Sequence, residues 1–395
     1  MDKLKVRKYL RLASVIVFSM MVGSVITMFI KGDNFLIRGK STTKKANYAD
    51  FEPLYETYDT LMKDYYKDVD SKTLIEGAIN GMLNTLGDQH TVYFNEEAKD
   101  DFETQLQGKY YGIGAQIQYV EENKVQVVAI FDDSPAEKAG LKVGDIFVSI
   151  DGKSTDGMDA TAIATVLKSS KVSKSKLVMN RDGEEIEIEI TKDNITLTSV
   201  SSKMLEDDIG YIGIGLFGKL TKSQFDDALK KLEKEDMKTL IIDLRGNTGG
   251  YLTTVTEMLE TFVAKDKVLY KIENNDGIKD YKSSAKDVKK YDIVVLINEA
   301  SASASEIMAA SLRTNCDAKL VGKTTFGKGT VQITKNLSNN TMIKYTIEKW
   351  LTPEGNNIEG EGVKPDYEVD LDEDYANDPS DENDSQLQKA IDLLK

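Results

Sequence analysis

Strands alternate with helical segments along the second half of the chain, and this alternation constrains the fold more than any other sequence feature. From Gly210 onward, apolar runs of strand length are separated by segments with apolar residues at helical spacing. Strands joined by helices form crossover units of a largely parallel sheet, so an α/β core is expected, with its chemistry in the loops at the strand ends. The predicted strands are Tyr211–Ile214, Thr239–Leu244, Ile293–Asn298 and Lys319–Val321.

The two regions before this core have other patterns. Residues 109–192 show short strands separated by turn residues, with one helical pattern near Asp159–Lys168, which predicts a small β-rich domain. Residues 48–108 carry apolar residues at helical spacing, so a helical region is expected. Its apolar stripes should pack in the core of the chain, with a dimer contact as the alternative. The predicted strands of the β-rich domain are Gly114–Tyr119, Val125–Ile130, Ile146–Ile150, Lys176–Asn180 and Glu185–Ile190.

An apolar, uncharged run from Leu12 to Ile30 follows the basic residues 1–11. A spanning helix needs roughly 20 apolar residues, whereas the apolar part of a secretory signal is usually about 7–15 residues long. We therefore expect a transmembrane helix over residues 12–30, with a cleaved signal peptide as the alternative. The positive-inside rule keeps the basic end in the cytoplasm and places everything after Lys31 outside.

Two further segments lie outside the folded regions. The polar residues 31–47 suit a flexible stalk between the anchor and the first helix. At the other end, residues 371–384 are acidic and irregular, and residues 385–395 have the pattern of a short amphipathic helix.

Composition excludes several classes of function. A net charge of −15 makes nucleic acid an unsuitable partner. The single cysteine, Cys316, has no partner for an internal disulfide and is expected to be a buried small hydrophobe. His90 is the only histidine, which excludes His-rich metal sites and makes any Ser-His-Asp triad depend on that position. No metal or cofactor is expected.

A glycine loop begins the β-rich domain. Gly112, Ile113, Gly114 and Ala115 precede a strand, and backbone amides there can approach an anion such as a peptide carboxylate. The alternative is that the glycines only permit a tight turn. The later segment Ser134–Ile146 has the pattern S-P-A-x-x-A-G-L-x-x-G-D-x-I, and it resembles a PDZ domain. The resemblance implies that an extended C-terminal peptide binds beside a strand, with its carboxylate in the glycine loop.

The segment from Ala300 to Glu306 leads from a buried strand into a helical pattern. The amides at the start of a helix, and the positive end of its dipole, can stabilise an oxyanion. Ser303 is therefore suited to acyl transfer at this junction. Ser303 and Glu306 also have the spacing of a capping box, in which the serine only satisfies the backbone.

A lysine flanked by glycines follows, in the run from Lys323 to Gln332. If the chain is extended from Lys328 onward, Lys328, Thr330 and Gln332 share one face, and Gln332 can orient the amine. A lysine in an apolar pocket has a lowered pKa and can accept the proton of a serine. The alternative is an ordinary solvated lysine. A nucleotide-binding loop is excluded, because the Gly-Lys-Thr at Gly322 lacks the upstream glycine.

Taken together, five ordered motifs resemble the carboxyl-terminal processing proteases, also called tail-specific proteases or family S41. They are the PDZ insert, the D-L-R-x-N-x-G-G loop at Asp243–Gly250, the S-A-S-A-S-E segment at Ser301–Glu306, the T-F-G-K-G-x-V-Q segment at Thr325–Gln332 and the end motif from Leu351 to Asp366. The resemblance implies a multidomain α/β protein. Its serine protease core, over residues 193–370, would be of the Clp-protease/crotonase type, with the PDZ domain inserted at 109–192.

The resemblance also implies residue roles. Ser303 would be the nucleophile of a Ser-Lys dyad, Lys328 its general base and Gln332 the hydrogen-bond partner of that base. The amides of Ala304 and of a glycine in the 245–250 loop, here taken as Gly249, would form the oxyanion hole. The substrates would be proteins held by their C-termini, and a homodimer is possible.

Three other interpretations compete with this one. A triad through His90 is disfavoured, because that residue belongs to the N-terminal helical region, in a segment where Gln89 replaces the usual proline of the family and whose role is taken as structural. A membrane-tethered PDZ adaptor with an inactive protease domain is disfavoured by the presence of Ser303, Lys328 and Gln332. A conventional serine esterase is disfavoured because no G-x-S-x-G motif occurs. The expected function is a single-pass, extracytoplasmic bacterial serine endopeptidase.

Overall fold

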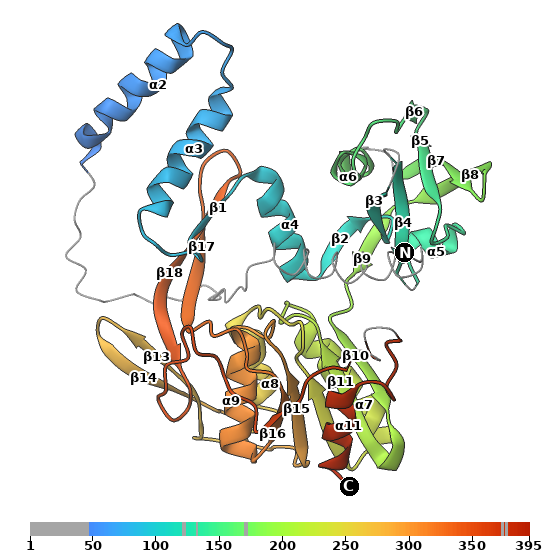
Figure 1. Cartoon of the computed structure of the whole chain (residues 1–395), viewed down its shortest axis with the longest axis vertical. Coiled ribbons are helices and arrows are strands. Elements are labelled where there is room, and N and C mark those ends of the chain that lie inside the picture. The colour runs from blue at the N-terminus through green and yellow to red at the C-terminus, as the bar shows by residue number, and fades with distance from the viewer. Residues whose placement is uncertain (1–46, 121–123, 132, 170–172, 373–374, 376–377) are drawn as a thin grey trace. The chain divides into compact units, whose positions relative to one another are not determined.

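The structure is a computed structural model that describes residues 47–120, 124–131, 133–169, 173–372, 375 and 378–395 (Figure 1). The transmembrane helix predicted over residues 12–30 and nearly all of the predicted stalk lie outside these ranges. Within them, no helix combines the length and the apolar character that crossing a bilayer requires. The chain forms two compact units, of which one is Gly108–Leu197 and the other comprises the residues on both sides of it.

The larger unit is built on a mainly parallel sheet of six strands in the order β10-β11-β12-β15-β16-β19. Only the β10–β11 pair is antiparallel. All four strands predicted for the α/β core lie in this sheet. The strands are β10 (Val200–Met204), β11 (Ile209–Ile214), β12 (Thr239–Asp243), β15 (Ile293–Ile297), β16 (Lys319–Gly322) and β19 (Tyr367–Glu368).

Helices cover this sheet on both faces because its strands are apolar on both sides. In β12, Leu240 and Ile242 belong to the main core cluster, with residues of α7 (Thr221–Lys234), α8 (Leu252–Leu259) and α9 (Ala304–Cys316). Ile241, between them, belongs to a second cluster with Leu387 and Ala390 of α11 (Ser385–Asp392). Alternate residues of one strand therefore face different helices.

Cys316 ends α9 as a half-buried thiol against the main core. It is less buried than the sequence analysis expected. Burial raises the pKa of its thiol to about 11, so the thiolate is scarce at neutral pH.

A second, antiparallel sheet in this unit was not predicted from the sequence. Its longest strand, β18 (Met342–Leu351), pairs with β1 (Val92–Phe94), β13 (Val268–Asn274) and β17 (Thr330–Asn336), and β13 pairs in turn with β14 (Gly277–Lys282). β1 comes from the N-terminal region, so residues near position 90 lie beside residues near position 345. The short helix α4 (Glu96–Gln107) follows β1.

The expectation that the N-terminal helices pack in the core is wrong for most of their length. α2 (Glu52–Asp64) has no buried residue among those described, and α3 (Ser71–Asn84) buries only Leu83. Apolar side chains on them remain exposed, among them Tyr55 at 67% and Met82 at 50%. Both helices form as expected, but the residues that the structure describes do not cover their apolar side chains.

The smaller unit contains a sheet in the order β3-β4-β5-β7-β8, with β6 paired to β5, and a separate β2–β9 pair. One long helix, α6 (Ala160–Ser169), corresponds to the predicted helix. The five predicted strands match β3, β4, β5, β7 and β8. The bounds are β2 (Lys109–Gly112), β3 (Ala115–Val120), β4 (Lys124–Ile130), α5 (Pro135–Lys138), β5 (Ile146–Ile150), β6 (Lys153–Ser154), β7 (Lys174–Arg181), β8 (Glu184–Thr191) and β9 (Asp193–Thr196).

Candidate active site

Ser303 lies at the junction between β15 and α9, in a strained backbone conformation. Its φ of 62° and ψ of −115° match the first central position of a type II′ turn, which glycine usually occupies. Its side chain is fully buried, and Oγ has no hydrogen-bond partner among the described residues. A strained residue with an unsatisfied buried hydroxyl indicates a functional site rather than a structural one.

Glu306 connects the serine turn to the lysine loop. One carboxylate oxygen, Oε2, accepts hydrogen bonds from the backbone nitrogens of Ser303 (2.6 Å) and Lys328 (2.9 Å). Oε1 accepts from the backbone nitrogen of Gly327 (2.7 Å) and from Thr325 Oγ1 (2.6 Å). Glu306 therefore makes its half of the predicted capping box, whereas Ser303 Oγ accepts no backbone hydrogen bond in return from the described residues. Glu306 also binds the backbone nitrogens of both proposed catalytic residues through one oxygen atom. The sequence spacing gave no signal of this second role.

Lys328 is fully buried at the end of the loop between β16 and β17. Its backbone is fixed on both sides, because its nitrogen donates to Glu306 and its carbonyl oxygen accepts from Trp350 Nε1 (2.7 Å). Burial, followed by the charge of Lys344, lowers the pKa of Lys328 well below the ordinary value of lysine, against the opposing effects of nearby carboxylates that include Glu306. The amine of Lys328 therefore becomes neutral at a lower pH than the amine of a solvated lysine does.

Two residues near Lys328 were not identified from the sequence as part of this region. Lys344 of β18 is buried, with Nζ 5.7 Å from the ring centroid of Phe94 and 5.8 Å from that of Phe102. Burial lowers the pKa of Lys344 to about 8. His90 precedes β1, and burial followed by the charge of Lys328 lowers its pKa to about 4.

The exclusion of His90 from the site assumed that the N-terminal helical region lies apart from it. That premise is wrong, since β1 pairs with β18 and brings the segment close to Lys328. No local motif announces this pairing, because the paired residues are about 250 positions apart. With a pKa near 4, His90 is neutral at physiological pH.

Gln332 lies on β17 and is fully buried. Its Nε2 donates to Thr330 Oγ1 (2.9 Å) and Thr346 Oγ1 (3.1 Å). These two bonds fix the amide orientation, and Oε1 has no hydrogen-bond partner among the described residues. Gln332 therefore presents a buried acceptor that would suit an amine donor. No hydrogen bond joins this oxygen to Lys328 among the described residues, so the pairing of Gln332 with the lysine amine stays a prediction. A register shift between Val331 and Gln332 also interrupts the simple alternation along the strand.

The glycine loop after β12 contacts the serine turn directly. A Cβ on Gly249 would lie 2.9 Å from Ser303 Cβ, so only glycine fits there. The Gly249 amide already donates to Asn247 Oδ1 (2.9 Å). The carbonyl oxygen of Asn247 accepts from the Ala302 nitrogen (3.0 Å) and from Ser305 Oγ (2.8 Å). Asn247 thus joins the glycine loop to both sides of Ser303.

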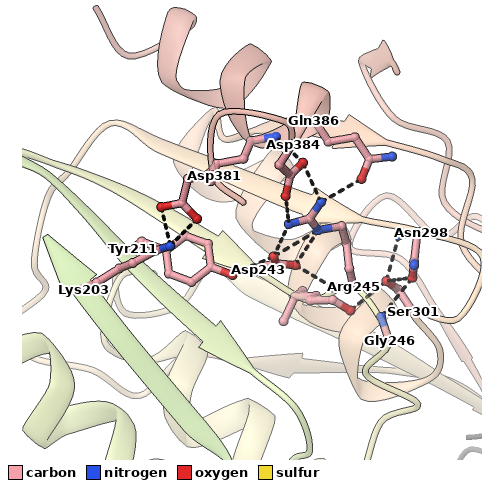
Figure 2. A network of polar contacts seen from close by, with 12 residues as sticks. Lys203, Tyr211, Asp243, Arg245, Gly246, Asn298, Ser301, Asp381, Asp384 and Gln386 are labelled. Carbon is pink, nitrogen blue, oxygen red and sulfur yellow. Dashed lines mark hydrogen bonds and ion pairs between the residues drawn. The ribbon is translucent and has the colours of Figure 1, made fainter. Parts of the chain in front are cut away.

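Arg245, at the start of the same loop, is the centre of a buried ionic network (Figure 2). Its guanidinium binds Asp243 with Nη2 at 2.6 Å, and Asp384 with Nη1 and Nη2 at 3.0 and 2.8 Å. Nη1 also donates to Gln386 Oε1 (3.0 Å), and Tyr211 Oη donates to Asp243 Oδ2 (2.8 Å). All charges of this network have partners.

In the smaller unit, the predicted peptide-binding residues lie between β2 and β3. Gly112 ends β2, Ile113 is buried, and Ala115 begins β3. Gly114 has a φ of 80°, and a Cβ on it would come within 2.3 Å of Ser134 Cβ, so the tight-turn interpretation also holds. β3 pairs only with β4 among the described strands, which leaves its other edge for an added strand.

The residues around Ser303 suit nucleophilic chemistry. Among the residues that the structure describes, no group of three His, Cys, Asp or Glu side chains is arranged to hold a metal ion. Ser303, Ala304, Gly249, Lys328 and Gln332 all belong to the larger unit, and backbone contacts bring Ser303, Gly249 and Lys328 together. The four peptide-binding candidates belong to the smaller unit.

Comparisons with known families match this organisation. The family model for peptidase family S41 matches residues 208–369, and a PDZ-domain model matches residues 126–181. A third model, for the N-terminal domain of the activating protease CtpB, matches residues 21–98.

Relatives resemble the chain over most of its length. The chain is 35% identical over 372 residues to the carboxy-terminal processing protease CtpA of Bacillus subtilis (strain 168), covering 94% of this chain and 79% of that protein. It is 38% identical over 320 residues to the carboxy-terminal processing protease CtpB of the same strain, covering 80% of this chain and 66% of that protein. A solved Bacteroides fragilis structure assigned to the S41 proteases has a TM-score of 0.51 at 15% identity, covering 86% of this chain and 96% of that one, and it supports the fold alone.

Proposed function

The chain belongs to peptidase family S41, as a carboxy-terminal processing serine protease with a PDZ domain, and from that premise we propose that it cleaves proteins through a Ser303–Lys328 dyad. The observation that carries the proposal is the shared acceptor: Glu306 Oε2 binds the backbone nitrogens of both residues. Further support comes from the buried Oγ of Ser303, which has no hydrogen-bond partner among the described residues, and from the lowered pKa of Lys328.

In the proposed mechanism, Ser303 Oγ attacks the scissile carbonyl while neutral Lys328 takes its proton. The lysine then gives this proton to the leaving amine, and an acyl-enzyme forms on Ser303. Water, deprotonated by Lys328, releases the new C-terminus and regenerates the serine. Gln332 Oε1 would accept a hydrogen bond from the lysine amine and orient it.

The oxyanion would be stabilised by two backbone amides. Ala304 is the first residue of α9, so its amide has no acceptor within the helix. For the second donor we favour Gly250 over Gly249, because the Gly249 amide is already bonded to Asn247 Oδ1. This refines the residue taken from the family resemblance.

Substrate proteins would be recognised by their C-termini in the smaller unit. The outer edge of β3 offers main-chain groups to an extended peptide, and the Gly112–Ala115 loop lies at the start of that strand. This is the β-augmentation mode of PDZ recognition. Replacing Gly114 by alanine should weaken peptide binding, and unchanged binding of a C-terminal peptide would contradict this assignment.

The location proposed for the protein rests on its N-terminal sequence, and the proposed assembly rests on exposed apolar side chains. The apolar run Leu12–Ile30 after a basic N-terminus supports a single-pass anchor with the protease outside the bacterial cytoplasm. Digestion of intact spheroplasts by an added protease should remove the large C-terminal portion, and full protection would contradict this orientation.

The apolar side chains exposed on α2 and α3 support a second copy of the chain as a partner. Light scattering should then give twice the monomer mass.

The direct test is cleavage of an unfolded protein by the purified full-length chain and by two variants. Ser303→Ala and Lys328→Ala should lose cleavage while retaining their fold and their affinity for C-terminal peptides. Undiminished cleavage by the Ser303→Ala protein would exclude the proposed nucleophile. A wild-type protein that binds such peptides but never cleaves would support the adaptor interpretation instead.

A further inference from the structure

The last described segment of the chain binds the loop that contacts the nucleophile, although the two are about 140 residues apart in sequence. Figure 2 shows Asp384 and Gln386 facing the guanidinium of Arg245. Asp384 uses both carboxylate oxygens, so the pair has the fork geometry that fixes an arginine in orientation as well as in place. Both side chains are largely buried, with 12% of Arg245 and 5% of Asp384 exposed.

Asp384 is itself held rigidly. Its Oδ1 accepts from the backbone nitrogen of Leu387 (2.9 Å), which makes it the N-cap of α11. Leu387 and Ala390 of that helix pack on the parallel sheet in the second core cluster. An anchored carboxylate can position Arg245, because the helix cannot follow the arginine if the loop moves.

Arg245 begins a short loop that reaches Ser303. Its backbone nitrogen donates to Asp243 Oδ1 (2.8 Å), and the next residue, Gly246, donates to Asn298 Oδ1 (3.0 Å). Asn247, which follows Gly246, binds the backbone of Ala302, and Gly249 lies against Ser303. A displacement of Arg245 would therefore move the groups that surround the nucleophile.

We propose that Asp384 is a positioning residue for the reaction, acting through Arg245 to hold the 245–250 loop against Ser303. The inference rests on the proposed function, since it assigns Asp384 an effect on a reaction at Ser303. Asp384 then affects the reaction only through Arg245 and is not itself one of the reacting groups.

A matched control exists in the same segment. Asp381 forms an ion pair with Lys203 at 2.5 Å, but both side chains are more than 40% exposed and neither contacts Arg245. Exposed pairs of this kind contribute little to stability. Asp381→Asn therefore changes the same segment and the same chemical group without touching the loop.

The experiment compares Asp384→Asn, Asp384→Ala and Asp381→Asn in the full-length protein, with kcat and KM for an unstructured peptide and the rate at which a fluorophosphonate labels Ser303. Both Asp384 variants should lose about tenfold or more in kcat and in labelling rate, because small misplacements of a reacting group are costly, while KM changes less than threefold. Asp381→Asn should retain the wild-type values. Melting temperatures are measured so that rates are compared well below unfolding.

A double-mutant cycle with Arg245→Met separates positioning from general structure. If Asp384 acts through Arg245, adding Asp384→Asn to Arg245→Met should lower kcat by less than twofold. An undiminished effect of Asp384→Asn in that background would overturn the inference, as would wild-type kcat in Asp384→Asn or an equal loss in Asp381→Asn. Cleavage by Ser303→Ala would instead sink the proposed function, whatever the Asp384 variants do.

Discussion

Two buried polar regions of the larger unit differ in how their charges are compensated. Around Arg245, burial would lower the pKa of the guanidinium, but Asp243 and Asp384 outweigh it and the net pKa is raised. Around Lys328, burial and the neighbouring Lys344 outweigh the nearby carboxylates, and the net pKa is lowered. The guanidinium of Arg245 keeps its charge because carboxylates pair with it, whereas the surroundings of Lys328 favour the neutral amine.

The difference separates supporting structure from reactive structure. A paired buried ion is costly to disturb, because removing one partner leaves the other uncompensated. A buried lysine with a lowered pKa, and a strained serine whose hydroxyl has no partner among the described residues, hold free energy that folding would otherwise release. Mutation of the first region should cost stability, with the smaller loss of kcat expected for Asp384, and mutation of the second should cost mainly activity.

The largest expected effect is on the reactive side. Lys328→Met should lower kcat by about 10²–10⁴-fold, the range that general acid–base catalysis contributes. The same variant should melt at a higher temperature than wild type at neutral pH. In the unfolded chain Lys328 has its ordinary pKa of about 10.4, and in the folded protein its pKa is lower. Between these two pKa values the unfolded state binds more protons than the folded state, so the stability of the wild type rises with pH.

The gain from Lys328→Met should therefore shrink toward alkaline pH. Calorimetry across pH checks this, with Lys323→Met as the control. Lys323 lies in the same loop but is partly exposed and paired with Glu368 and Asp370, so its loss should leave activity unchanged. A Lys328→Met protein less stable than wild type at every pH would break the contrast between the two regions.

The next effect is on the compensated side. Arg245→Met leaves two buried carboxylates without their cation and should cost about 3–5 kcal/mol of unfolding free energy. In a domain of roughly 200 residues this lowers Tm by about 10 °C. Denaturant unfolding measures it. Lys203→Met removes only the exposed partner of Asp381, so its unfolding free energy should stay within about 1 kcal/mol of that of the wild type. Equal losses of unfolding free energy in the two variants would show that the buried pairing at Arg245 stabilises no more than the exposed pair.

A smaller effect is expected where the serine turn and the lysine loop meet. Glu306→Gln places an amide NH₂ against backbone donors that now share a carboxylate. We expect kcat to fall about 10²-fold, since the nucleophile and base lose their common anchor, with KM for a peptide little changed. Glu299→Gln, an exposed glutamate of the same turn, serves as the control. A higher KM with an unchanged kcat would instead indicate that Glu306 acts in substrate binding.

The sequence identified the proposed catalytic residues, whose roles stay a prediction, but not most of the residues that support them. Local motifs contain Ser303, Lys328 and Gln332, and local periodicity marks the parallel strands. Both could therefore be identified from the sequence. The pairing of β1 with β18 was not, because register between segments about 250 residues apart leaves no local pattern. For the same reason His90 and Lys344 were not placed beside Lys328.

The partners of Arg245 could not be predicted from the sequence either. Asp384 was read only as part of an acidic, irregular tail, since a charge run gives no sign of the one carboxylate that meets a guanidinium. Glu306 was visible as a helix cap, but its contact with the lysine loop depends on how that loop folds back. The exposure of α2 and α3 also could not be foreseen, because an apolar stripe predicts burial without naming the covering surface.

The central claim, that Ser303 is the nucleophile and Lys328 its base, is tested most directly by locating a covalent label. The protein is treated with a fluorophosphonate, digested and sequenced by fragmentation mass spectrometry, which resolves Ser303 from Ser301 and Ser305. We predict modification of Ser303 alone in the wild type, and labelling slowed at least about 10²-fold in Lys328→Met. Modification of Ser301 or Ser305 instead, or an unchanged rate in the lysine variant, would contradict the account.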